Sequence, residues 1–150
     1  MNYNIKVKKT IPEAIIPTKG SEYAAGYDLY IPKTKENPIK IGPKEKLVIN
    51  TGIAMEIPQG YVGLVFVRSS IGIKRGIQLQ NQCGVIDSDY RGDIMVAIKN
   101  TGLEEQELAR GERIAQIIIV PYLANTTLFE VSELDDTARG TGGIGSSGRM

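Results

Sequence analysis

Ile114-Ala115-Gln116-Ile117-Ile118-Ile119-Val120 is the most apolar stretch of the chain, and it decides the fold class. A short, nearly continuous run of β-branched residues is typical of a strand that is buried on both faces. The stretch follows a turn at Gly111-Glu112 and is far too short to cross a bilayer. Gln116 is polar, and because buried polar groups are hydrogen-bonded, we expect it to have a specific partner. We expect Arg113, where the run begins, to form a structural ion pair.

Shorter apolar runs recur on the N-terminal side of this stretch, and Gly, Pro, Asn or Asp residues separate them. Tyr61–Val67 is rich in β-branched and aromatic residues and follows the turn Pro58-Gln59-Gly60, as a strand does. Further strands are expected at Ile5–Val7, Leu47–Ile49, Ile53–Met55, Ile77–Gln80 and Ile94–Ile98. The best helical candidate is one or two turns at Ser69–Lys74, with Ser69 as the cap. The pattern predicts an all-β domain, either a barrel or a jelly roll.

The composition restricts the possible functions. The chain of 150 residues is long enough for one domain with a real core. Its 18 Lys and Arg residues balance 17 Asp and Glu residues, so we expect no nucleic-acid partner, and no segment suggests a membrane. With no histidine and one cysteine, Cys83, one chain cannot build the usual zinc sites or an internal disulfide. The first residues lack the apolar segment of a signal peptide, so we expect a soluble cytoplasmic protein.

Gly84-Val85-Ile86-Asp87-Ser88-Asp89-Tyr90-Arg91-Gly92 is the most informative stretch for function. Because the chain has no histidine, a general base near neutral pH must be another residue type, and a carboxylate on a rigid hairpin is the leading candidate. Asp87 follows the apolar pair Val85-Ile86, so we expect it where a buried strand meets a turn, with one side buried. Taken alone, such a segment is more often a β-turn in which Asp and Gly only satisfy backbone geometry.

Four other blocks place polar residues beside turn-forming ones. They are Ala25-Gly26-Tyr27-Asp28-Leu29, Val67-Arg68-Ser69-Ser70, Asn81 and Gly111–Gln116. In the second block, a bidentate guanidinium, a hydroxyl and the N–H groups of a helix start would suit a phosphate. The amide of Asn81 has both a donor and an acceptor, so it is able to read the edge of a base.

The last residues, Arg139–Met150, are rich in glycine and serine. A disordered tail is the simplest explanation of this composition. The alternative is a flexible strap, in which backbone N–H groups, serine hydroxyls and Arg139 wrap a phosphate.

In their order and spacing, these blocks resemble the five motifs of the trimeric dUTP diphosphatases (dUTPases), from Ala25 to Gly148. The resemblance implies an all-β jelly roll or distorted β-barrel with a flexible Gly-rich C-terminal tail. Residues 1–132 would form the barrel, and residues 133–150 would form an arm that closes over a neighbouring subunit's active site. The assembly would be a homotrimer with three active sites, each lined by all three chains.

The same resemblance implies the reaction. It would be the hydrolysis of dUTP to dUMP and diphosphate, with Mg²⁺ bound to the triphosphate. This activity supplies dUMP for thymidylate synthesis and keeps uracil out of DNA. No direct protein ligand of the metal is implied, and Asp28 and Gln116 would support the ion through its waters.

Roles for single residues follow from the resemblance. Asp87 matches the general base that orients water for attack on the α-phosphorus, and Tyr90 matches the aromatic residue under the deoxyribose. The residues of the uracil pocket would be Asn81, Val85, Ile86 and Met95. The phosphate contacts would be Arg68, Ser69, Ser70 and Gln116, joined by Arg139, Gly145, Ser146 and Ser147 of the tail.

One residue departs from the family pattern. The family's tail usually carries an aromatic residue that stacks on uracil, and this chain has Ile144 at that position. An isoleucine covers the base with an apolar face but offers no ring.

Two other functions remain as alternatives. A dCTP deaminase resembles dUTPase in fold and in several motifs, but it uses a glutamate at the position that is Ala97 here, which disfavours deamination. A regulatory binding module of the same fold, without catalysis, is the second alternative. The joint presence of the candidate base and the phosphate contacts argues against lost catalysis.

Overall fold

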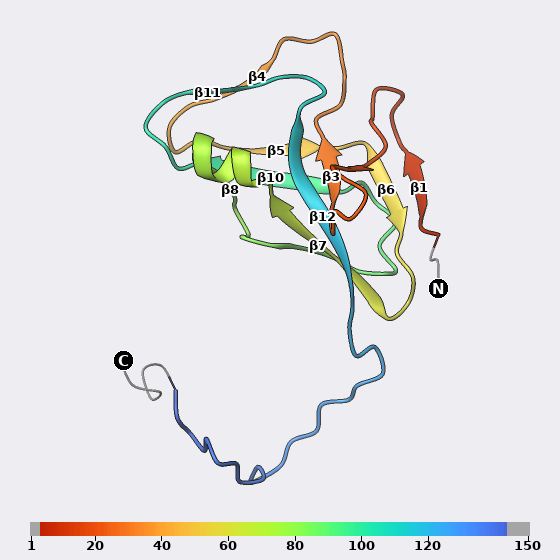
Figure 1. Cartoon of the computed structure of the whole chain (residues 1–150), viewed down its shortest axis with the longest axis vertical. Helices are drawn as coiled ribbons and strands as arrows, with labels where there is room; N and C mark the ends of the chain where they lie inside the picture. The colour runs from red at the N-terminus through yellow and green to blue at the C-terminus, as the bar shows by residue number, and fades with distance from the viewer. Residues whose placement is uncertain (1–3, 144–150) are drawn as a thin grey trace.

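The computed structural model describes residues 4–143, which form β-strands and one short helix (Figure 1). In chain order the elements are β1 (Lys6–Lys9), β2 (Thr18–Lys19), β3 (Tyr27–Tyr30), β4 (Ile39–Ile41), β5 (Lys46–Asn50), β6 (Ile53–Glu56), β7 (Tyr61–Val67), η1 (Ser70–Lys74), β8 (Ile77–Leu79), β9 (Gly84–Ile86), β10 (Met95–Asn100), β11 (Gln106–Leu108) and β12 (Arg113–Pro121). The all-β class predicted from the sequence is confirmed. Among the described residues, none of the helical segments has the length and apolar character needed to span a membrane.

The apolar run that opened the sequence analysis forms β12, the central strand of a five-stranded antiparallel sheet with the order β2-β3-β12-β7-β9. It pairs with β3 as far as Ile117 and with β7 as far as Pro121. Ile114 and Ala115 are buried, as predicted. The prediction is wrong for residues 118–120, which are only half-buried, because β3 no longer pairs with that half of the strand.

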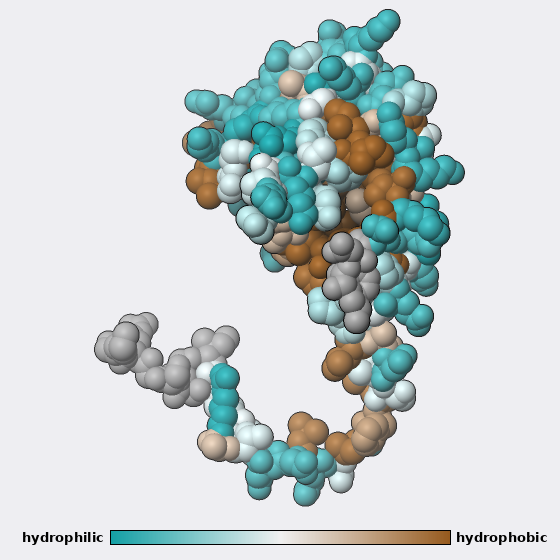
Figure 2. Space-filling model, turned by 45° about the vertical axis from the view of Figure 1, so that its right-hand side comes forward, coloured by the Kyte–Doolittle hydropathy of each residue, from teal (hydrophilic) through white to brown (hydrophobic). Residues whose placement is uncertain are grey.

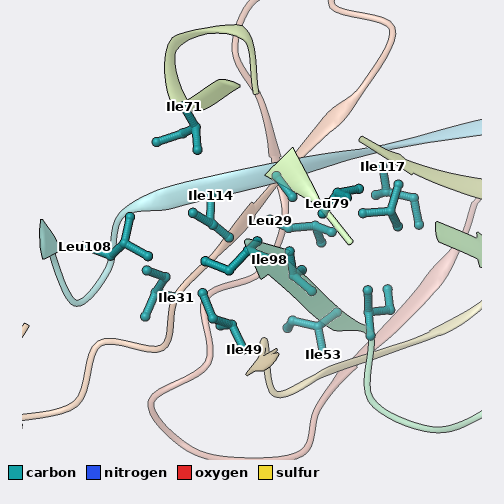
Figure 3. Packing of buried hydrophobic residues seen from close by; sticks show 14 of the residues in the cluster. Leu29, Ile31, Ile49, Ile53, Ile71, Leu79, Ile98, Leu108, Ile114 and Ile117 are labelled. Atoms are coloured by element: carbon teal, nitrogen blue, oxygen red, sulfur yellow. The ribbon is translucent and has the colours of Figure 1, made fainter. Parts of the chain in front are cut away.

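A second sheet, with the order β5-β10-β8, and two strand pairs, β1-β6 and β4-β11, complete the barrel. Buried isoleucine, leucine and valine side chains from both sheets form one core (Figure 3). In β10, Val96 and Ile98 are buried, whereas Met95, Ala97 and Lys99 are more exposed, which is the alternation of a strand with one buried face. Two layers around one core fit the jelly-roll architecture.

The helical turn η1 follows β7 with two residues between them and confirms the helix expected at residues 69–74. It is a π-helix, a rare wide turn that is frequent at functional sites. The predicted cap is wrong, because Ser69 has helical backbone angles and makes no side-chain capping hydrogen bond. The N–H groups of Ile71 and Gly72 donate instead to the carbonyl oxygen of Arg68, at 3.0 and 2.9 Å. The Ser69 hydroxyl is therefore not used by the helix.

Strand structure ends at Pro121, and the following residues, 122–143, leave the barrel as an extended segment (Figures 1 and 2). Leu123, Leu128, Phe129 and Leu134 in this segment are between 80% and 98% exposed. These four side chains therefore do not contribute to the core of the barrel. The division between barrel and arm at residues 132 and 133 stays a prediction.

Candidate active site

Three neighbouring strands of the five-stranded sheet bring a carboxylate, an amide and a guanidinium together. Asp28 of β3 lies opposite Gln116 of β12, and β7 flanks the same position of β12 from the other side. Arg68 comes directly after the last residue of β7. These residues are far apart in the sequence, and strand pairing alone makes them neighbours.

Asp28 is a buried carboxylate, 6% exposed, that two arginines hold. Arg68 Nε lies 2.9 Å from Asp28 Oδ1, and Arg113 Nη1 lies 3.2 Å from Asp28 Oδ2. The structural ion pair expected for Arg113 is thereby confirmed. One carboxylate between two guanidinium groups leaves one positive charge uncompensated, so this part of the sheet favours an anion.

A hollow of about 210 Å³ opens beside this ion pair. Its lining residues are Gly20, Ser21, Ala24, Gly26, Asp28, Arg68, Ser69 and Gln116. Gly26 is buried, and a Cβ atom there would lie 2.8 Å from Gln116 Oε1. The missing side chain of Gly26 is therefore what leaves room for the Gln116 amide.

Gln116 lacks a side-chain hydrogen bond within residues 4–143, so the specific partner expected from the sequence is not supplied by that part of the chain. Its amide lines the hollow together with Ser69 and Arg68. A hydroxyl, an amide and a guanidinium around one concave, positively charged surface are donors that suit a phosphate. Ser70 is exposed next to them at the start of η1 and does not line the hollow.

The same residues can support a metal ion only indirectly. The described part of the chain contains no group of three or more His, Cys, Asp or Glu side chains that could hold one. Both oxygens of Asp28 already bind guanidinium groups, so Asp28 does not fit as a direct ligand. A carboxylate oxygen accepts more than one hydrogen bond, and Mg²⁺ keeps several of its waters when it binds phosphates. Asp28 therefore fits the expected role of holding a metal-bound water.

The candidate base lies at the edge of the five-stranded sheet. The hairpin expected around it from the sequence is wrong, because β8 pairs with β10 in one sheet and β9 pairs with β7 in the other. Asp87 directly follows β9, and its carbonyl oxygen accepts a hydrogen bond from the Tyr90 N–H at 3.2 Å, which closes a turn. The expected one-sided burial of Asp87 is wrong for the single chain: Asp87 is exposed, because β9 is an edge strand and the turn leaves the sheet. Asp87 lines a second hollow, of about 740 Å³, together with Asp89 and Arg91.

Tyr90 is anchored through its hydroxyl group. Its hydroxyl donates to the carbonyl oxygen of Asp93 at 3.0 Å, and a Cβ at Gly92 would collide with that hydroxyl. The Asp93 carboxylate accepts a hydrogen bond from Asn50 Nδ2 at 2.7 Å. The anchor formed by Asn50 and Asp93 was missed in the sequence, because no local pattern connects the end of β5 to the residues before β10.

The expected uracil-reading residues lie in the connection between β8 and β9, on β9 and on β10. Asn81 is in the turn between β8 and β9, and Ile86 is half-buried in β9. Val85 and Met95 are 62% and 47% exposed. Three of these residues lie on β9 and in the turn before it, and the role of all four stays a prediction.

The two hollows lie at opposite ends of the sheet. Ile86 pairs with Gly63 near the start of β7, and Asp87 lies beyond it, whereas Arg68 follows the end of the same strand. Residues 63 to 68 span about 17 Å at roughly 3.3 Å per residue. The structure therefore does not bring the candidate base of one chain to the phosphate contacts of that chain.

The described residues include the first part of the expected tail, up to residue 143. Arg139 is exposed, and its Nε donates to the carbonyl oxygen of Gly142 at 3.0 Å. Ile144, Gly145, Ser146 and Ser147 lie outside the described residues. Elsewhere, Gly20 and Ser21 line the first hollow but were not singled out in the sequence, where the pair indicates only a turn.

Known proteins match this chain over almost its whole length. A family model described as dUTPase matches residues 12–148. A deoxyuridine 5'-triphosphate nucleotidohydrolase from Escherichia phage T5 is 45% identical, over 96% of this chain and 98% of that protein. An enzyme of the same name from Nautilia profundicola is 43% identical, over 97% of this chain and 99% of its own.

Solved structures agree with these matches. A dUTPase of Staphylococcus bacteriophage 80alpha with dUpNHpp has a TM-score of 0.88 and 30% identity, and the match covers 99% of this chain and 100% of that one. A dUTPase from phage phi11 of S. aureus, which coordinates a structural Mg(II) ion, has a TM-score of 0.79 and 26% identity, over 89% of this chain and 100% of that one.

Proposed function

The chain belongs to the dUTPase family, and we propose that it hydrolyses dUTP to dUMP and diphosphate with Asp87 as the general base. The observation that carries this proposal is the positively charged hollow at Arg68, Asp28 and Gln116, in a chain that exposes Asp87 at the end of β9. The product supplies thymidylate synthesis, and removal of the substrate keeps uracil out of DNA. A reaction on the nucleotide pool also leads us to propose the cytoplasm as its location.

The phosphate chemistry fits the residues around the first hollow. Displacement at phosphorus needs little covalent help from a protein, because positioning and charge neutralisation do most of the work. Arg68 binds Asp28 through Nε, so its terminal nitrogens are able to face a phosphate oxygen. Ser69 and Gln116 add a hydroxyl and an amide donor, and Arg139 and the serines of the tail add further donors when the tail closes.

The proton in this reaction goes to Asp87. In the proposed step, Asp87 takes a proton from water, the water oxygen forms a bond to the α-phosphorus, and the bond to the bridging oxygen of the leaving diphosphate breaks. Tyr90 packs under the deoxyribose and leaves no room for a 2′-hydroxyl. Asn81 and the backbone at Val85 and Ile86 read the uracil edge. Met95 borders the same pocket.

The separation of the two hollows supports a homotrimer. Asp87 and Arg68 of one chain stand at opposite ends of β7, so a working site requires Asp87 from one subunit and the phosphate hollow from another. Burial of the exposed apolar side chains of residues 122–143 would favour packing of this segment on a neighbouring subunit. We propose that the tail of a third chain then covers the site.

Mg²⁺ is the proposed cofactor. It would be held by the triphosphate, with Asp28 and Gln116 holding waters of its shell, and would neutralise charge on the phosphates. The Mg(II) ion coordinated in the phage phi11 relative is consistent with a metal in this family.

The two alternatives make different predictions at named positions. Ala97 of β10, where a dCTP deaminase would need a glutamate, has no group that transfers a proton. A regulatory module without catalysis would not need Asp87 in addition to the residues that bind the substrate.

The deciding experiment incubates the protein and Mg²⁺ with dUTP, dCTP, dTTP or UTP and assays diphosphate and ammonia. Diphosphate from dUTP alone is expected; ammonia from dCTP, or no product at all, would replace this function with one of the alternatives.

The first prediction concerns Gly26. We expect Gly26→Ala to raise the KM for dUTP several-fold, because the new Cβ would stand 2.8 Å from Gln116 Oε1 and push the amide out of place. The barrel should keep its stability to within about 1 kcal/mol, since the displaced group is the end of a flexible side chain. Steady-state kinetics and urea unfolding measure both quantities. Gly60→Ala is the control, because a Cβ there meets nothing within 4 Å, although its φ of +84° adds local strain.

A second prediction concerns Ile144. We expect Ile144→Phe to lower the KM for dUTP by up to about tenfold, or roughly 1.4 kcal/mol, because a ring adds stacking on the base. Turnover should change less, since the base is remote from the α-phosphorus. Ile144→Gly should raise the KM. Equal KM values for Phe, Ile and Gly would mean that the tail does not touch the base.

A further inference from the structure

The short helix η1 connects the phosphate hollow to a second part of the barrel. Arg68 and Ser69, which line the hollow, stand directly before it in the chain. Its end is Arg75, whose backbone N–H donates to the Gly72 carbonyl oxygen. Arg75 does not line the hollow, and the proposed function gives it no role.

The guanidinium of Arg75 uses all three of its nitrogens to bind β11 and the turn before β12. Nη1 lies 2.6 Å from Glu112 Oε1, and Nε donates to Gln106 Oε1 at 3.2 Å. Nη2 donates to the carbonyl oxygen of Glu107. The side chains of Arg75 and Glu112 are only 22% and 26% exposed, so water and salt screen this pair less than a surface pair.

Glu112 lies immediately before β12. Its second oxygen accepts a hydrogen bond from the Ala109 N–H at 2.9 Å, which fixes the turn before the strand. The next residue, Arg113, begins β12 and binds Asp28. Gln116 follows on the same strand.

Both ends of η1 are therefore tied to β12. At the start of η1, Arg68 is tied through Asp28, which also binds Arg113. At its end, Arg75 is tied through Glu112. A helix of five residues that is held at both ends has little freedom to move relative to the strand.

We propose that Arg75 is a positioning residue of the triphosphate site. By holding the end of η1 against the start of β12, it sets where Arg68 and Ser69 stand relative to Gln116. This inference rests on the proposed function, in which the hollow takes the triphosphate. Arg75 acts through η1, without touching the substrate.

A second arginine, Arg110 in the connection between β11 and β12, serves as the control. Its Nη2 lies 2.6 Å from Glu36 Oε2, its side chain is also 22% exposed, and its Nε donates to the Asn37 carbonyl oxygen at 3.0 Å. The Arg110–Glu36 pair thus has the same chemistry, although Glu36 is 69% exposed and Glu112 only 26%, and it holds the loop before β4 instead of η1. Arg75→Gln and Arg110→Gln each remove one arginine–glutamate pair, and we expect only the first to disturb the phosphate site.

The experiment measures the Kd of dUpNHpp and of dUMP, with steady-state kinetics on dUTP and urea unfolding, for the wild-type protein and both variants. In Arg75→Gln we expect the Kd of dUpNHpp and the KM of dUTP to rise about tenfold, with kcat changed less than about threefold. The Kd of dUMP, which lacks the β- and γ-phosphates, should change less than about twofold. Arg110→Gln should bind both nucleotides like the wild type.

The outcomes separate this inference from the proposed function. Loss of dUMP and dUpNHpp binding to the same degree in Arg75→Gln, or equal behaviour of the two variants, would overturn the positioning role. A wild-type protein that neither binds dUpNHpp nor hydrolyses dUTP would overturn the proposed function itself. If Arg75→Gln does not fold, Arg75→Lys keeps a cation at Glu112 but cannot also reach Glu107; a smaller loss of dUpNHpp affinity is then expected, and wild-type affinity would overturn the proposal.

Discussion

Asp87→Asn is expected to lower kcat for dUTP at least about a hundredfold, which is the scale for removal of a general base. The amide cannot take the proton of the attacking water at neutral pH, although its size is almost that of the carboxylate. Asp87 makes no ion pair in the described structure and is exposed, so its replacement should leave the turn after β9 and the barrel intact. Rapid-quench or steady-state assays of diphosphate release measure the rate, and the Kd of dUpNHpp shows that the site still binds.

Asp89→Asn is the matched control for this experiment. Asp89 lies on the same turn, is also exposed and lines the same hollow. Removal of its charge changes the local field by the same amount without removing the proposed base, so we expect turnover within a few-fold of the wild type. A rate for Asp87→Asn that matches the Asp89→Asn rate would mean that the base lies elsewhere.

A mixture of two inactive variants is expected to regain activity. One variant is Asp87→Asn, and the other is Arg68→Gln, which weakens the phosphate hollow. In a cyclic trimer whose sites combine Asp87 of one chain with Arg68 of a neighbour, random mixing restores both residues in about a quarter of the sites. Each variant alone should stay near background, so the recovered activity should exceed that of either parent many-fold. Unfolding and refolding the two proteins together, followed by a diphosphate assay, tests this expectation.

The double variant Asp87→Asn/Arg68→Gln, refolded with Asp87→Asn, is the control for the mixture. It offers no chain that carries an intact Asp87, so no activity should return. Light scattering on the same samples reports the mass of the assembly. An active monomer, or a mixture that remains inactive although both parents form trimers, would contradict the shared site.

The sequence was a good guide wherever a local pattern reports a local structure. The alternation and the apolar runs predicted seven of the strands, including Tyr61–Val67 at its observed bounds. They did not predict β3, because Gly26 and Asp28 have turn-forming character and Asp is disfavoured in strands. Two arginines from other strands compensate the buried Asp28, and no local pattern reports such compensation.

The burial expected for Asp87, which the structure does not show, illustrates the same limit of sequence patterns. An apolar pair before a carboxylate predicts a buried strand end, yet Val85 is 62% exposed because β9 has a neighbour on one side only. The position of a strand within a sheet depends on which other strands pair with it. A pattern along one strand cannot report that position.

The sequence by itself determined the all-β class, the family and the residue types that the chemistry needs, because strand periodicity and motif spacing are properties of the chain. Only the tertiary structure decided which of these residues meet. The pairing of β3, β12 and β7 brings Asp28, Gln116 and Arg68 together, while the register of β7 with β9 holds Asp87 at the far end of the sheet. The tie between Arg75 and Glu112 likewise exists only in the folded chain. Contacts between distant segments form when the shared core fixes the strands against one another, and their registers are then set by burial across the whole barrel.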